Sequence, residues 1–136
     1  MPSARYLLDT NIVSDLARNP GGKVAGRIRE VGPALIATTV VVACEIRFGA
    51  AKSDSRKLRQ RLDLLLNEIQ ILPFDAPADR HYAEIRLHLE RAGTPIGPND
   101  LLVAAHARAL DLVLVTDNEK EFARVKKLSV ENWLRG

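Results

Sequence analysis

A chain of 136 residues has room for one compact core, and we expect a single domain over residues 1–136. Hydrophobic residues make up 46% of the sequence, which excludes a disordered chain, whereas the 4% of aromatic residues argues against a single-strand platform of stacked rings. The net charge of +3 is compatible with a polyanionic partner without identifying one.

Apolar runs and helical periodicity alternate along the chain. In chain order they predict a strand at 5–8, helices from residue 12 and over 23–31, a strand at 34–37, helices over 40–51 and 56–69, a strand at 71–74, helices over 77–91 and 98–110, a strand at 112–115, a short helix over 119–124 and a last strand near 128–130. This order predicts an α/β fold of three layers, α/β/α, around a mostly parallel sheet. Pro73 favours an edge position for the strand that contains it.

The single cysteine and the absence of apolar spans restrict the setting of the protein. Cys44 excludes an internal disulfide, and its apolar neighbours predict a small buried side chain. The sequence has no charged-then-apolar leader and no apolar stretch that would span a bilayer, so we expect a cytoplasmic protein without membrane contact.

Two predicted strands end alike, with Asp9 after one and Asp117 after the other. The carboxyl ends of parallel strands share one edge of a sheet, so these aspartates are expected to be neighbours. Each is also explained by a simpler role as the N-cap of the following helix, and this alternative stays open.

Two further acidic residues have routes to the same edge. Glu45 interrupts an apolar run and shares a helical face with Val41 and Phe48, where a carboxylate is costly unless an arginine or a bound cation compensates it. Asp100 falls in the first turn of an apolar, alanine-rich helix, either as a cap or as a member of the cleft.

A cluster of Asp9, Glu45, Asp100 and Asp117 would suit a hard divalent ion. Mg²⁺, with Mn²⁺ as a substitute, prefers oxygen ligands to histidine or cysteine and supports phosphodiester hydrolysis. The polar neighbours Thr10, Asn11, Thr116 and Asn118 are candidates to orient carboxylates or a phosphate, although each is also an ordinary turn residue.

The motifs around these residues together resemble the PIN domain, and more narrowly the VapC (FitB-like) toxins of bacterial type II toxin–antitoxin systems. The resemblance covers nearly the whole chain and is carried by Leu-Leu-Asp-Thr-Asn at 7–11, Val-Ala-Cys-Glu-Ile-Arg-Phe-Gly at 42–49, Ile-Gly-Pro-Asn-Asp-Leu-Leu-Val-Ala-Ala-His-Ala at 96–107, Thr-Asp-Asn-Glu-Lys-Glu-Phe at 116–122 and Val-Glu-Asn-Trp at 130–133. It implies a PIN-like α/β/α domain with the acidic quartet Asp9, Glu45, Asp100 and Asp117.

The resemblance also implies an activity and partners. The activity is that of a Mg²⁺-dependent endoribonuclease that arrests translation, commonly by cutting transfer or ribosomal RNA. The implied partners are a second copy of the chain in a homodimer and a cognate antitoxin, which obstructs the site and carries the complex to operator DNA.

Other assignments fit the sequence less well. His81, His88 and His106 do not have the spacing of a shared metal set, and His106 is expected to be a core residue. A haloacid-dehalogenase-type phosphatase would need a second aspartate where Asn11 stands. A non-enzymatic co-repressor in an antitoxin–DNA complex would leave Glu45 without a purpose, and the chain has no evident DNA-reading motif.

Overall fold

A five-stranded sheet with every strand parallel to its neighbours forms the centre of the computed structural model, which describes residues 3–135. The strand order is β3-β2-β1-β4-β5, so the first strand lies in the middle. The strand bounds are β1 Tyr6–Leu8, β2 Ile36–Thr39, β3 Gln70–Leu72, β4 Val113–Val115 and β5 Val130–Glu131. The predicted α/β fold with a parallel sheet is confirmed, and β3 is the expected edge strand, although it covers Gln70–Leu72 and ends before Pro73.

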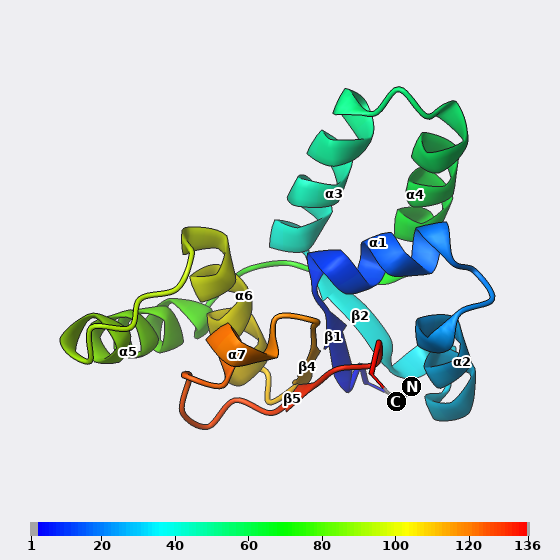
Figure 1. Ribbon diagram of the computed structural model, residues 1–136. Coiled ribbons are helices and arrows are strands. Elements are labelled where there is room, and N and C mark those ends of the chain that lie inside the picture. The colour runs from blue at the N-terminus through cyan, green and yellow to red at the C-terminus, as the bar shows by residue number, and fades with distance from the viewer. Residues whose placement is uncertain (1–2, 136) are drawn as a thin grey trace.

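Seven α-helices in the described residues cover the two faces of the sheet. They are α1 Thr10–Arg18, α2 Lys23–Val31, α3 Val40–Lys52, α4 Arg56–Glu68, α5 Ala78–Arg91, α6 Pro98–Ala109 and α7 Glu119–Phe122. The strands β2 and β3 are added on one side of β1, and β4 and β5 are added on its other side. Because each crossover is right-handed, this change of side places α1–α4 on one face of the sheet and α5–α7 on the other. Figure 1 shows these two groups on opposite sides of the strands, with α5 packed beside α6.

Local sequence explains where most elements begin. The side chain of Thr39 accepts a hydrogen bond from the Val41 N–H and thereby caps α3. The second strand is displaced from its predicted position at 34–37. Residues Pro33–Leu35 form a 3₁₀ turn instead, because proline at the first position favours a turn, and the strand starts at Ile36.

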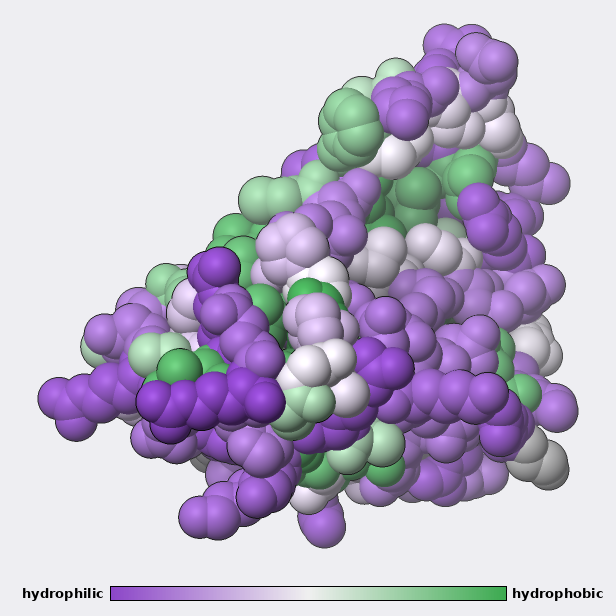
Figure 2. All heavy atoms as spheres, turned by 60° about the vertical axis from the view of Figure 1, so that its left-hand side comes forward, coloured by the Kyte–Doolittle hydropathy of each residue, from purple (hydrophilic) through white to green (hydrophobic). Residues whose placement is uncertain are grey.

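The helices α3 and α4 project together from the carboxyl edge of the sheet (Figure 1). This part of the molecule exposes large apolar side chains, Val40 and Phe48 on α3 and Leu64 on α4. Figure 2 shows apolar atoms gathered along this projection on an otherwise mostly hydrophilic surface. We call these two helices the arm.

Cys44 corrects an expectation from the sequence, because its side chain is exposed. The buried residues of α3 are Val42, Ala43 and Ile46, so the core lies against a different side of the helix from the one that Cys44 occupies. An apolar run along the chain therefore did not mean burial on every side of the helix. Among residues 3–135, no helix is both long enough and apolar enough to cross a membrane.

Candidate active site

Two neighbouring strands deliver polar residues to one point on the sheet edge. Leu8 of β1 lies opposite Val115 of β4, and the Asp9 N–H extends this ladder by donating to the Val115 carbonyl at 2.9 Å. The chain changes sides of the sheet between these two strands, and such a switch point is where open parallel sheets bind ligands. Thr38 of β2 supports the same point by donating its hydroxyl to the Leu8 carbonyl at 2.7 Å.

Asp9 is a buried carboxylate, with only 4% of its surface exposed. Its Oδ1 accepts from the Thr10 N–H at 2.9 Å, and its Oδ2 accepts from the Thr116 hydroxyl at 2.8 Å. The capping contact with Thr10 and the contact with Thr116 beyond the neighbouring strand therefore coexist in one residue. Burial is the largest cause of the raised pKa of Asp9, the two hydrogen bonds oppose it, and the charge of Glu45 adds to it.

Glu45 reaches the cluster through Thr10, whose hydroxyl donates to Glu45 Oε1 at 2.9 Å. The side chain is half-buried, and Phe48 on the same helix is 65% exposed, so the expected core-facing stripe lies at the surface of the molecule. Arg47 does not compensate Glu45, because its guanidinium lies 3.3 Å from Asp63.

Asp100 lies in the first turn of α6, and its pKa is shifted more than that of any other carboxyl group in the cluster. Its pKa is raised to about 7, first by burial, then by a hydrogen bond with Glu121, and then by the charges of Asp9, Glu121 and Glu45. The structure thus brings together three of the four predicted carboxylates and adds Glu121, which the sequence did not single out.

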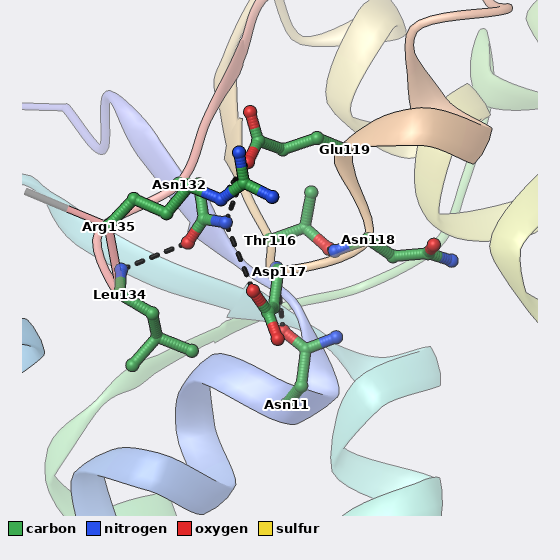
Figure 3. Close-up of polar contacts among 8 residues, drawn as sticks. All are labelled: Asn11, Thr116, Asp117, Asn118, Glu119, Asn132, Leu134 and Arg135. Atoms are coloured by element: carbon green, nitrogen blue, oxygen red, sulfur yellow. Dashed lines mark hydrogen bonds and ion pairs between the residues drawn. The ribbon is translucent and has the colours of Figure 1, made fainter.

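Asp117 takes a different direction from the one predicted. Its side chain is exposed, and Oδ1 accepts a hydrogen bond from the Asn132 amide at 3.0 Å, while its backbone N–H donates to Asn11 Oδ1 at 3.0 Å. Figure 3 shows Asp117 between Asn11 and Asn132. Asn11 thus holds the backbone of the turn after β4, and its role in orienting carboxylates or a phosphate stays a prediction.

The remaining polar neighbours hold the turn after β4. Thr116 is fully buried, donates to Asp9 and accepts the Asn118 N–H at 3.0 Å. The Asn118 amide donates to Glu121 Oε2 at 2.8 Å. Asn118 is the N-cap residue of α7, but its side chain makes no capping bond to the backbone of the helix, and its amide instead holds the carboxylate of Glu121.

The donor set suits a hard divalent cation. In residues 3–135, none of Asp9, Glu45, Asp100 and Glu121 has an arginine or lysine ion-pair partner, so their mutual repulsion is uncompensated by the protein. As the side chains stand in the described residues, no three of them lie close enough together to share an ion. All four offer only carboxylate oxygens, the ligands that Mg²⁺ and Mn²⁺ prefer.

His106 confirms the expectation of a core residue. It is 2% exposed, and its Nδ1 lies 2.7 Å from the Thr39 hydroxyl, which joins α6 to the start of α3. Its Nε2 is buried without a partner among the described residues, and burial lowers the pKa of the imidazole. The ring is therefore neutral near pH 7 and contributes packing rather than charge.

We predict that neutralising Asp100 stabilises the metal-free protein. A carboxyl whose folded pKa is about 7, against 3.8 as the ordinary value, binds more protons when folded, so the free energy of unfolding falls as the pH rises through that interval. Asp100→Asn should therefore have a higher Tm than wild type in EDTA at about pH 8, and the difference should narrow at about pH 5. The exposed Asp79→Asn serves as the control, and a pH-independent difference for Asp100→Asn would contradict the assigned charge coupling.

Both the sequence and the fold of this chain are similar to those of known proteins. Residues 6–128 match the family model described as PIN domain. The chain is 38% identical to Ribonuclease VapC2 of Rickettsia felis over 94% of this chain and 97% of that protein, and 35% identical to the tRNA(fMet)-specific endonuclease VapC of Shigella flexneri over 95% and 98%.

The fold comparison agrees. The crystal structure of VapBC2 from Rickettsia felis bound to a DNA fragment from their promoter superposes with a TM-score of 0.87 at 35% identity, covering 94% of this chain and 98% of that one.

Proposed function

This chain belongs to the PIN domain family, among relatives named VapC ribonucleases, and we propose that it is a Mg²⁺-dependent endoribonuclease and the toxin of a type II toxin–antitoxin pair. The single observation that carries the nuclease assignment is the uncompensated carboxylate cluster at the switch point of the sheet, with the pKa of Asp100 raised to about 7. A lone capping aspartate would not have its pKa raised by three further carboxylates.

We infer that Asp9, Glu45, Asp100 and Glu121 hold the ion. These residues would hold a divalent ion, which would supply activation of a water and stabilisation of the charge that develops during phosphodiester hydrolysis. Thr116 and the Thr10 N–H fix both oxygens of Asp9, and the Thr10 hydroxyl fixes Glu45. Asp117 as a further ligand stays a prediction that its contact with Asn132 does not favour.

The RNA substrate is proposed to be a transfer or ribosomal RNA. The proposal of transfer RNA is supported by the name of the Shigella flexneri relative, which is 35% identical along nearly the whole chain. The low aromatic content favours recognition of RNA by shape and backbone charge rather than by stacking of unpaired bases.

We propose two protein partners, a cognate antitoxin and a second copy of the chain. The antitoxin is supported by the similarity to VapBC2 with promoter DNA, through which this chain would meet operator DNA indirectly. The exposed apolar side chains of the arm, Val40, Phe48 and Leu64, give such partners a surface to bury.

Metal removal tests the proposed activity. Purified protein should cleave RNA in Mg²⁺ or Mn²⁺, lose the activity in EDTA and regain it when the ion is restored, because the four carboxylates repel one another without a cation. Cleavage is followed on a labelled transfer RNA and on a ribosomal RNA fragment. Undiminished cleavage in EDTA would overturn the metal-dependent mechanism.

A further inference from the structure

We propose that Asn132 is a positioning residue for the carboxylate cluster, which it serves by holding the turn of residues 116–119; this inference rests on the proposed nuclease function. Asn132 lies in the segment 131–135, which we call the strap. The strap lies beside the turn that follows β4, and Figure 3 shows Asn132 between Asp117, Glu119 and the backbone of Leu134.

The amide of Asn132 bridges two carboxylates of the turn. Its Nδ2 donates to Asp117 Oδ1 at 3.0 Å and to Glu119 Oε1 at 2.8 Å, and its Oδ1 accepts from the Leu134 N–H at 2.9 Å. The last contact fixes which end of the amide faces the turn. Arg135 adds an ion pair with Glu119 at 3.2 Å, but both side chains are substantially exposed, so that pair is weak.

The strap itself has a firm anchor in Trp133. This side chain is only 3% exposed, and the centroid of its ring lies 5.1 Å from the ring centroid of Tyr6 in β1. The guanidinium of Arg27 covers the indole ring at 5.4 Å, and the indole N–H donates to Glu131 at 2.9 Å. Because Trp133 is buried, the neighbouring Asn132 is held in place while its amide hydrogen-bonds the turn.

Residues at both ends of the turn hydrogen-bond carboxylates of the cluster, so the position of the turn affects theirs. At one end, the Thr116 hydroxyl donates to Asp9. At the other end, Asn118 donates to Glu121, which hydrogen-bonds Asp100. A shift of the turn thus changes the placement of two carboxylate neighbours together, although Asn132 contacts neither Asp9 nor Asp100 among the contacts of residues 3–135.

The neutrality of the amide matters for this role. A lysine or arginine at this position would also donate hydrogen bonds to Asp117 and Glu119, but its positive charge would reduce the negative potential that attracts a cation. An amide donates to both oxygens and leaves their charge in place. Asn132 therefore orders the turn without weakening the electrostatic attraction of the site for a divalent ion.

The test compares Mn²⁺ binding by the full chain with and without the amide. Isothermal titration calorimetry on Asn132→Ala should give a dissociation constant for Mn²⁺ about 10-fold weaker than wild type, the size of effect expected when a group that supports metal ligands is removed. Asn19→Ala is the matched control, because its amide makes the same kind of bond to Asp15 at 2.7 Å but at the far end of α1. Its Mn²⁺ affinity should stay within about twofold of wild type.

A rescue variant separates positioning from mere stability. Asn132→Asp alone should bind Mn²⁺ more weakly than wild type, because residue 132 then has no donor for Asp117 or Glu119 and adds a third carboxylate beside them. Adding Asp117→Asn and Glu119→Gln inverts every donor and acceptor of the bridge, and this triple variant should recover most of the lost affinity. Tm values measured in EDTA for each variant report stability independently, and a purely structural role would lower Tm without changing the Mn²⁺ affinity of the folded protein.

Two results would overturn the proposal: wild-type Mn²⁺ affinity in folded Asn132→Ala, or no recovery in the triple variant. If Asn132→Ala does not fold, the comparison of the triple variant with Asn132→Asp decides alone. Failure of the proposed nuclease function would appear differently, since the wild-type protein itself would then not bind Mn²⁺ or cleave RNA.

Discussion

Asp9→Asn is expected to lower the rate of RNA cleavage by about 10²- to 10³-fold at saturating Mg²⁺, a size typical of removing one preorganised charge from an active site. The substitution keeps the shape of the side chain and an oxygen that can accept the Thr10 N–H. The new amide can donate to the Thr116 hydroxyl oxygen, so the loss is one of charge and not of fold. Initial rates on a labelled RNA, together with Tm, measure the two effects separately.

The matched control is Asp79→Asn, an exposed aspartate in the first turn of α5 with no ion pair among the described residues. Its cleavage rate should stay within about twofold of wild type, as for most surface substitutions. Equal rates for Asp9→Asn and wild type would sink the assignment of the cluster as the active site.

Glu121→Gln is expected to lower the rate of RNA cleavage by about 100-fold, and Asp117→Asn by less than about 10-fold. Glu121 hydrogen-bonds Asp100 inside the cluster, whereas the exposed Asp117 bonds Asn132 outside it. An asparagine at 117 keeps an oxygen that can accept from Asn132, so the turn is preserved. Cleavage rates and Mn²⁺ dissociation constants of the two variants provide the measurement.

The opposite ranking has a defined meaning. A larger loss in Asp117→Asn than in Glu121→Gln would show that the turn rearranges when the ion binds and that Asp117, as the sequence suggested, supplies a ligand. Lys120→Ala is the control for both variants, because Lys120 is an exposed residue of the same short helix α7. Its cleavage rate should stay within about twofold of wild type, as expected for a surface substitution.

The fold could be predicted from the sequence because the sheet is built from short apolar runs, and polar residues mark the ends of these runs. β1 and β4 are such runs, and their pairing places Asp9 beside Thr116 for any chain that forms this parallel sheet. The helix of Asp100 was predicted for the same reason, since Pro98 fixes its start and its alanines require burial.

The parts of the site that the sequence did not reveal depend on side-chain direction. Asp117 and Glu121 are four residues apart around a turn, and only the position of Asn132 and Asp100 decides which carboxylate faces inward. Asn132 comes from a segment beyond the last strand, and no local pattern links it to the turn. Glu45 was assigned to a core-facing stripe because periodicity does not show which side of α3 the core occupies.

The central place of β1 in the sheet has a consequence for how the chain folds during synthesis. The segment that contains Asp9 leaves the ribosome first, but its partners Val115 and Thr116 and the carboxylate of Glu121 follow more than a hundred residues later. The carboxylates of the proposed site are therefore brought together only after β4 and α7 have been synthesised and β4 has paired with β1.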